Sequence, residues 1–289
     1  MKHIDEFLDY LLVIKKHSPN TIKNYKIDLL EFMDYTGNNI NITKDDVNNY
    51  LKYLYDNNVS KSTISRKLSS LRSFYNYLIK KEVLKDNYFT LIKNPKKEGN
   101  LPKFVKEDDI DKMFLVPDTR RWIGQRNLVI IRMLYATGLR VSELVNIKLK
   151  DINIKERTIK VLGKGSKERI VVFGIHTEEA LDNYLNRGRR EVDYHASEYL
   201  FLNKDGNKLS DRYVRKILDD IIIKSSIEMH VSPHMLRHTF ATGMLNNGAD
   251  LVSVKELLGH ESLNTTSIYT HVSDDKIREI YNKAHPRAK

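Results

Sequence analysis

A short basic segment divides the sequence into two parts with different patterns. Residues 93–104, KNPKKEGNLPKF, contain two prolines, one glycine and four lysines. Proline and glycine interrupt regular structure, and this composition is typical of an exposed linker between domains. Helical periodicity alone precedes the segment, whereas both helical and alternating β-branched patterns follow it. The sequence therefore predicts a helical domain over residues 1–92, a linker over 93–104 and a second domain over 105–289.

The front part predicts four helices. Ser18 and Pro19 are residue types preferred at the N-cap and in the first turn of a helix. Thr43, with Asp46 three residues later, is close to a capping box and predicts another helix start. The fourth helix is expected over residues 60–81, SKSTISRKLSSLRSFYNYLIKK. We expect these helices to form one compact domain.

The fourth helix begins the most basic part of the chain. Residues 61–100 contain ten Lys and Arg and three Asp and Glu, and ten minus three gives +7 of the total net charge of +11. Such cations neutralise phosphates and dominate the affinity of proteins for nucleic acids. The alternative is a solvated helix followed by a basic linker. The favoured interpretation is a DNA-contacting face made of Arg66, Lys67, Ser70 and Arg72.

The second part combines helices with a β-hairpin. An apolar helix is expected to end at Gly138, a natural C-cap, and RVSELVNI follows as a short helix. Alternating β-branched runs on both sides of GKGS, residues 163–166, predict the hairpin. Residues 199–209, YLFLNKDGNKL, predict a further short strand and turn. Helices are expected from Ser210 to the end, so the fold class is mainly α (α+β) with a small antiparallel sheet.

Composition excludes several classes of protein. Hydrophobic residues make up 40% of the chain and charged residues 30%, which fits a soluble globular protein. No run approaches the roughly 18 apolar residues of a membrane span, and the N-terminus lacks the pattern of a secretory signal. The absence of cysteine excludes disulfides, thiolate metal sites and cysteine nucleophiles. We expect a cytoplasmic protein.

The pentapeptide HMLRH allows more than one kind of site. His234 and His238 have the spacing that places two imidazoles on one helix face for a metal, but a hydrolytic zinc motif has glutamate where Met235 lies. An anion site fits better, because Ser232 as N-cap places His234 in a first turn whose free N–H groups favour phosphate. Arg237, one turn later, can donate two parallel hydrogen bonds to phosphate oxygens. Alone, the motif also fits an ordinary helix with a surface histidine.

Three further segments contain residues that could act at the same phosphate site. ATGLRVSEL, LGKGSKER and LLGHESLNTTSIYTHV contain Arg140, Glu143, Lys164, His260 and Tyr269. In order and spacing, these segments together with H-x-x-R resemble the catalytic domain of the tyrosine recombinase (phage-integrase-type) family. The resemblance covers nearly the whole chain, because the helical front part is similar to the core-binding, SAM-like domain of that family.

The resemblance implies a complete active site for DNA strand cleavage. The corresponding residues of this sequence are Arg140, Lys164, His234, Arg237, His260 and Tyr269. Two arginines can neutralise the phosphoryl oxygens by paired hydrogen bonds, so that neither a metal nor another cofactor is expected. Tyr269 would be the nucleophile, and its 3′-phosphotyrosyl link would store the bond energy for rejoining without ATP. Glu143 is expected to support an active-site side chain, and His238 to pack nearby.

Two of these residues are candidates for the proton transfers. Lys164, at the hairpin tip, is the candidate general acid for the 5′-oxygen leaving group, and Lys167 is the competing lysine. Tyr269 has an ordinary pKa near 10 and therefore needs a base, for which His234 is the candidate. His260 would position the phosphate or hydrogen-bond to it.

The tail HVSDDKIREIYNKAHPRAK is similar to that of the XerC/XerD chromosome-dimer recombinases within this family. Ile277, Ile280 and Tyr281 form one side of a short amphipathic helix over residues 274–283, which needs a surface to cover it. The family docks such a helix in the next protomer, which closes a ring. We therefore expect docking in a neighbouring protomer, with Tyr281 and His285 in contact with that subunit or with solvent.

The resemblance also implies the partners. In this family two domains form a C-shaped clamp on duplex DNA, and two protomers occupy each recombination site. A homo- or heterotetramer on two sites then exchanges strands in pairs through a Holliday junction. Some members act with a paralogous recombinase or a DNA translocase. The sequence does not show whether this protein needs either partner.

The favoured function is therefore a site-specific recombinase that resolves chromosome or plasmid dimers. The alternative is an integrase of a mobile element or phage with the same chemistry. Many integrases carry an additional arm-binding domain, and we expect no room for one in this sequence. A type IB topoisomerase shares the chemistry but needs no ring. A non-catalytic DNA-binding protein on the same scaffold would not need all six site residues.

Overall fold

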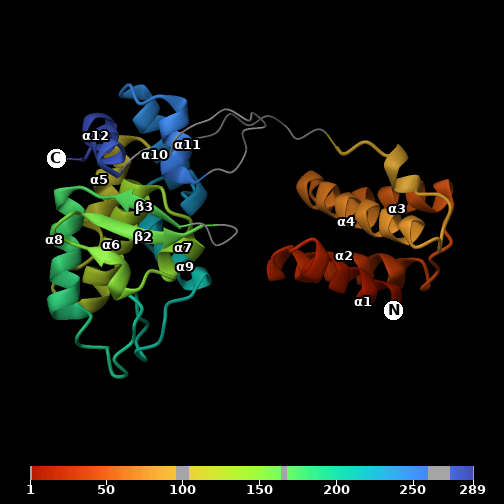
Figure 1. The fold of residues 1–289 in the computed structure, drawn as a ribbon, viewed down its shortest axis with the longest axis horizontal. Coiled ribbons are helices and arrows are strands. Elements are labelled where there is room, and N and C mark those ends of the chain that lie inside the picture. Colours follow the sequence, from red (N-terminus) through yellow and green to blue (C-terminus); the bar gives the residue numbers. More distant parts are fainter. Residues whose placement is uncertain (1, 96–103, 164–167, 260–273, 289) are drawn as a thin grey trace. The chain divides into compact units, whose positions relative to one another are not determined.

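The computed structural model describes residues 2–95, 104–163, 168–259 and 274–288 (Figure 1). The chain forms two compact units, Met1–Asn100 and Leu101–Lys289. The first is helical, and the second combines helices with a three-stranded antiparallel sheet, which confirms the predicted fold class. Within the described ranges, none of the helices has the length and apolar character required to cross a membrane.

The first unit is built from helices whose starts follow local capping rules. Its elements are α1 (Lys2–Asp9) with the π-helical turn η1 (Tyr10–Ile14), α2 (Pro19–Tyr35), α3 (Lys44–Asp56), α4 (Lys61–Lys80) and the 3-10 turn η2 (Tyr88–Leu91). The Ser18 hydroxyl accepts a hydrogen bond from the Thr21 amide at the start of α2. Thr43 and Asp46 form a complete capping box at the start of α3. Both predicted helix starts are confirmed.

Aromatic side chains fill the core of the first unit. The ring of Phe32 lies 4.8 Å from that of Tyr50 and 5.4 Å from that of Phe89, in edge-on contacts. An apolar stripe of α4 faces this core, and its buried members are Ile64, Leu68, Leu71, Tyr75 and Leu78. Burial of this stripe stabilises the unit, since it removes apolar area from water.

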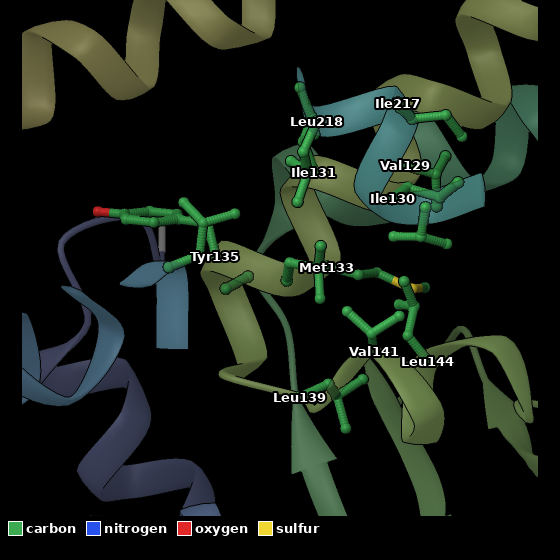
Figure 2. Packing of buried hydrophobic residues seen from close by; sticks show 14 of the residues in the cluster. Val129, Ile130, Ile131, Met133, Tyr135, Leu139, Val141, Leu144, Ile217 and Leu218 are labelled. Carbon is green, nitrogen blue, oxygen red and sulfur yellow. The ribbon is translucent and has the colours of Figure 1, made fainter. Parts of the chain in front are cut away.

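The second unit is organised around one buried helix, α6. Its helices and short helical turns are α5 (Glu107–Leu115), α6 (Trp122–Thr137), α7 (Val141–Val145), η3 (Leu149–Asp151), α8 (Ile175–Asn183), η5 (Tyr184–Gly188), α9 (Asp211–Lys224), α10 (Pro233–Asn246), α11 (Leu251–Leu258) and α12 (Asp274–Ala284). Figure 2 shows side chains of α6, including Val129 and Met133, among apolar residues of neighbouring elements such as Leu144 of α7 and Leu218 of α9. All four are fully buried, so α6 is the central support of this unit.

The predicted β-hairpin is present. Strands β1 (Ile152–Asn153), β2 (Thr158–Leu162) and β3 (Glu168–Val172) lie in this order in the antiparallel sheet. In the hairpin Thr158 pairs with Val172 and Leu162 with Glu168. The tip of the hairpin, residues 164–167, lies outside the described residues.

The further strand predicted within residues 199–209 does not form. Only two isolated bridges occur there, Lys148 with Tyr199 and Leu202 with Lys208, and no strand is assigned between them. Three consecutive residues, Leu200, Phe201 and Leu202, are all fully buried, whereas a strand at a surface would alternate. The apolar run that suggested a strand is a segment of chain that crosses the core.

The C-terminal helix α12 packs on its own chain. Tyr281 is fully buried against α10 and α11, in a cluster that includes Phe240 and Leu257. The His285 ring stacks on that of Tyr281, with 4.7 Å between the ring centroids. Both residues are buried in the single chain, so the expectation of contact with solvent is wrong, and contact with a neighbouring subunit stays a prediction. The apolar side of the helix predicted to dock in a neighbouring protomer is covered here by the chain's own α10, α11 and β3.

Candidate active site

The HMLRH motif begins α10 as the capping rules predict. The Ser232 hydroxyl accepts a hydrogen bond from the Met235 amide at 3.2 Å, and Pro233 is the first helical residue. His234 is therefore exposed in the first turn, whereas Arg237, one turn later, is buried. His238 is half-buried, with its Nε2 3.5 Å from the Thr242 hydroxyl. The described residues hold no group of three or more potential metal ligands.

A turn at Gly138 positions Arg140 at the site. Gly138 ends α6 with φ at +61°, in the left-handed region that favours glycine. A Cβ at this position would lie only 2.7 Å from side-chain atoms of Phe240 and Leu258. Because of this tight turn, Arg140 becomes the N-cap of α7, immediately beside α10.

Arg237 is fixed by two backbone carbonyl groups. Its Nη1 donates to the Gly138 oxygen and its Nη2 to the Leu258 oxygen, both at 2.6 Å. Only 7% of the residue is exposed. Burial, assisted by the positive charge of Arg140, lowers the pKa of Arg237 to about 10, so the guanidinium keeps its charge at neutral pH.

Glu143 holds two arginines with its two carboxylate oxygens. The backbone N–H and the Nη1 of Arg140 donate to it at 2.9 and 2.8 Å. The Nη1 and Nη2 of Arg169 donate at 3.0 and 2.8 Å. Burial alone would raise the pKa of Glu143, but the hydrogen bonds from Arg169 and Arg140 outweigh it and lower the pKa. Glu143 is thus an ionised support for Arg140.

Arg169 is a residue that sequence reasoning missed. It lies on β3, where it pairs with Val161, a buried residue of β2. Successive residues of a strand alternate between its faces, so Arg169 shares the inward face with Val171. A charged residue at an inward position of the predicted hairpin was the available signal, since buried charges are normally paired.

Arg140, His234 and Arg237 line one small pocket. It has a volume of about 100 Å³, which accommodates several water molecules or a phosphate-sized group. Ser142 of α7 and two residues of α9 also line it, and the complete lining is Leu139, Arg140, Val141, Ser142, Asp211, Arg215, Pro233, His234 and Arg237. Three cationic side chains and one carboxylate border the pocket, which therefore suits an anion. Lys164, His260 and Tyr269 lie outside the described residues.

The basic face predicted on α4 is partly an internal network. Lys67 is only 3% exposed and Ser70 is fully buried, so neither belongs to an exposed face. Lys67 pairs with Glu31 and lies 3.7 Å from a carboxylate oxygen of the buried Asp28. The Ser70 hydroxyl donates to Asp28 at 3.1 Å, and Arg66 also pairs with it. The prediction of an exposed face is wrong for Lys67 and Ser70, because a buried carboxylate of α2 requires them.

Arg72 also has partners within the first unit. Its Nε donates to the Phe89 oxygen at 3.2 Å and its Nη2 to the Ile92 oxygen at 3.0 Å. These bonds hold the turn that follows α4 against the helix. Among the four predicted DNA contacts, Arg66 and Arg72 are the two that remain partly exposed.

Comparison with protein families gives a clear assignment. The sequence profile of the Phage integrase family matches residues 103–276, more than half of the chain. The chain belongs to the phage integrase family. The profile of the phage integrase N-terminal SAM-like domain matches residues 4–82. Members of this family are tyrosine recombinases, and the chain is a site-specific tyrosine recombinase that acts on DNA.

Relatives and solved structures within the family extend over most of the chain. Tyrosine recombinase XerC of Oceanobacillus iheyensis is 46% identical over 294 residues, covering 99% of this chain and 96% of the relative. Tyrosine recombinase XerC of Anoxybacillus flavithermus is 43% identical, covering 98% and 97%. The crystal structure of the XerH site-specific recombinase bound to palindromic difH substrate, a post-cleavage complex, is 28% identical, with a TM-score of 0.69. It covers 90% of this chain and 79% of that one.

Proposed function

We propose that this tyrosine recombinase resolves chromosome or plasmid dimers by cleaving and rejoining DNA at a specific site. The observation that carries the proposal is the pocket lined by Arg140, His234 and Arg237. Three residues expected at a scissile phosphate meet there, from the start of α7 and from α10. The XerC relatives, at more than 40% identity over nearly the full chain, favour this role. Solved phage integrases are 15–22% identical and support the fold alone, so the alternative of a mobile-element or phage integrase has less support.

The two arginines bind the phosphate in this proposal. Both are held before substrate arrives, Arg140 by Glu143 and Arg237 by carbonyl oxygens of Gly138 and Leu258. Fixed donors stabilise the charge of a transition state without reorganising during the reaction. Three guanidinium groups, including that of Arg169, surround one carboxylate, and this surplus of positive charge supports an anionic substrate.

The covalent step uses Tyr269, His234 and Lys164, of which His234 alone belongs to the described residues. The Tyr269 hydroxyl attacks the phosphorus atom while the bond to the 5′-oxygen breaks, and a 3′-phosphotyrosyl link forms. His234 accepts the tyrosine proton, and Lys164 donates a proton to the leaving 5′-oxygen. His260 hydrogen-bonds to the phosphate. The reverse sequence, with a different 5′-hydroxyl as nucleophile, rejoins the strands and releases Tyr269.

The assembly that follows from this function contains several protomers on DNA. Residues 1–92 bind the duplex in part through Arg66 and Arg72, and residues 105–289 carry the chemistry. A tetramer on two sites brings four strands together. Docking of α12 in a neighbouring protomer would require it to leave the cluster around Tyr281. A paralogous recombinase and a DNA translocase are further candidate partners. A cytoplasmic location follows, because chromosomal DNA lies there.

The test is a suicide substrate. Duplexes that the protein selects from fragments of the host chromosome are nicked next to the cleavage position, so that cleavage releases a short fragment and traps the covalent complex. We expect the wild-type protein to form a complex that resists denaturant and that Tyr269→Phe cannot form. A complex with Tyr269→Phe would exclude this nucleophile. If the wild-type protein binds the selected duplexes but never reacts, a DNA-binding function on a recombinase scaffold replaces the proposal.

A further inference from the structure

Arg169 connects three elements that meet at the pocket. Its Nη1 and Nη2 donate to the two carboxylate oxygens of Glu143 on α7, at 3.0 and 2.8 Å. Its Nε donates to the Leu257 backbone oxygen in the last turn of α11, at 3.1 Å. Since Arg169 itself lies on β3, one guanidinium links the strand after the hairpin tip with α7 and α11.

The carboxylate of Glu143 is saturated with donors. Each of its oxygens accepts one hydrogen bond from Arg140 and one from Arg169. An ionised carboxylate offers about four acceptor positions, so these four bonds fix its plane. The orientation of the Arg140 guanidinium depends on this plane, because its Nη1 donates to one of the two carboxylate oxygens. Without Arg169, a buried carboxylate would lose half of its donors and would turn toward other partners.

A second connection runs from Arg169 toward Arg237. The two arginines donate to consecutive carbonyl groups at the end of α11, Leu257 and Leu258. The positive charges also complement the negative end of this helix. Gly259 follows with φ at +65°, and a Cβ there would lie 3.2 Å from the Arg169 side chain, so Arg169 packs closely under the helix end. The carbonyl that anchors Arg237 is thus held in place by its neighbour.

Arg169 itself has no direct access to the phosphate position. Its side chain is only 12% exposed, and each of its three nitrogens donates to the protein. It is absent from the residues that border the pocket in the described part of the chain. Its neighbours Arg140 and Arg237 border the pocket, and Arg169 touches the groups that hold both of them.

We propose that Arg169 is a positioning residue for DNA cleavage, which acts through Glu143 and the end of α11 to aim Arg140 and Arg237 at one phosphate. This inference rests on the proposed function, because it concerns the orientation of the groups that would bind the scissile phosphate. Arginine is required at this position, because a lysine cannot span both carboxylate oxygens and the Leu257 carbonyl at once.

The experiment compares cleavage with binding. Single-turnover cleavage of the nicked suicide duplex and the Kd for the same duplex are measured for wild type, Arg169→Gln and Arg169→Lys. We expect Arg169→Gln to cleave about 10- to 100-fold more slowly, as found for residues that orient active-site groups. Arg169→Lys should be intermediate, and both Kd values should stay within about threefold of wild type, since other cations hold the backbone.

A double-mutant cycle separates positioning from general stability. Arg169→Gln is introduced into the Glu143→Gln protein, where its main partner has lost its charge. Because Arg169 also holds the end of α11, the second substitution should still slow cleavage, but by less than Arg169→Gln does in the wild-type protein, since the two effects are not additive. Full additivity of the two effects would overturn the mechanism. Arg189→Gln is the matched control, because Arg189 is a buried arginine that pairs with Asp193 and with backbone carbonyls. We expect it to leave the cleavage rate of folded protein unchanged.

The outcomes distinguish this inference from the proposed function. If wild type forms no covalent complex, the proposed function fails first. If wild type reacts and Arg169→Gln reacts at the same rate, the inference alone fails. Circular dichroism establishes the folded fraction of each variant. If Arg169→Gln does not fold, Arg169→Lys decides, since it keeps the charge, and a wild-type rate for this variant overturns the inference.

Discussion

The guanidinium of Arg237 donates a 2.6 Å hydrogen bond to the backbone oxygen of Gly138, two residues before Arg140. The two arginines proposed to share one phosphate are therefore joined through a single turn of the backbone. Any movement of this turn displaces both of them. The position of the site depends on how α6 ends as much as on the side chains that line the pocket.

Replacement of either arginine should separate binding from chemistry. We expect Arg140→Ala and Arg237→Ala to lower the single-turnover cleavage rate by about 10²- to 10³-fold, the usual cost of removing one donor from a transition state. The Kd for duplex DNA should change by less than about tenfold, because many other cations contact phosphates. Gel-shift and suicide-cleavage assays on the same duplex measure the two quantities. Equal losses in binding and cleavage would show that the arginines act in binding alone.

The turn at Gly138 gives a prediction about stability. Gly138→Ala should lower the free energy of unfolding by about 2–4 kcal/mol, because alanine is strained at positive φ and its methyl group would collide with Phe240 and Leu258. Gly248→Ala is the matched control, since Gly248 also has positive φ but no atom lies within 4 Å of the added Cβ. It should cost only about 1 kcal/mol, the strain of the backbone. Urea unfolding measures both values, and equal losses would contradict the steric part of the argument.

Local signals predicted most of the framework. Ser232, Thr43 and Gly138 were assigned as caps from their own residue types and from neighbours within four positions, and the structure confirms all three. The hairpin was equally local, since its two strands flank a short glycine-containing tip. Capping and alternation operate over one or two turns of chain, so a single sequence contains the information.

Contacts between distant segments could not be predicted in this way. The burial of Lys67 and Ser70 depends on Asp28, which lies on another helix 39 and 42 positions away. Helical periodicity places such residues beside the apolar stripe, but it does not predict that a carboxylate of another helix faces them. The same limit applies to Tyr281. Amphipathic spacing shows that one side of a helix must be buried, but it does not identify the residues that bury it. Here the covering residues lie on the same chain.

The Asp28 network predicts a stability effect in the first unit. Asp28→Asn should lower the free energy of unfolding by about 3 kcal/mol, because Lys67 stays buried after losing one of its two charged partners. Asp34→Asn, on the exposed side of the same helix, is the control and should stay within about 0.5 kcal/mol of wild type. Chemical unfolding monitored by circular dichroism measures the difference. Similar values for the two variants would show that the network contributes nothing to stability.

The packing of α12 predicts that replacement of Tyr281 strongly destabilises this helix. Tyr281→Ala should destabilise the docked helix by about 3–5 kcal/mol, since it removes a fully buried aromatic ring. Tyr281→Phe keeps the ring and should retain the docked helix. Hydrogen exchange of the α12 amides, followed by mass spectrometry, reports its protection in each protein. Unchanged protection in Tyr281→Ala would mean that the cluster around this ring does not hold the helix.

His285 should make the docking of α12 sensitive to acid. Burial, with a smaller contribution from the charge of Arg287, lowers the pKa of His285 to about 4 from its ordinary value near 6.5. The aromatic rings of Tyr135, Phe240 and Tyr281 also face it and offer no anion to stabilise a proton. The unfolded chain therefore binds the proton first, and stability is complete above pH 6.5 and falls as the pH drops toward 4, by up to about 3 kcal/mol. His285→Phe removes this titration, so the difference in unfolding free energy between wild type and variant should change between pH 7 and pH 4.5. A constant difference over that range would show that His285 binds its proton equally in the folded and unfolded states, so that burial does not shift its pKa.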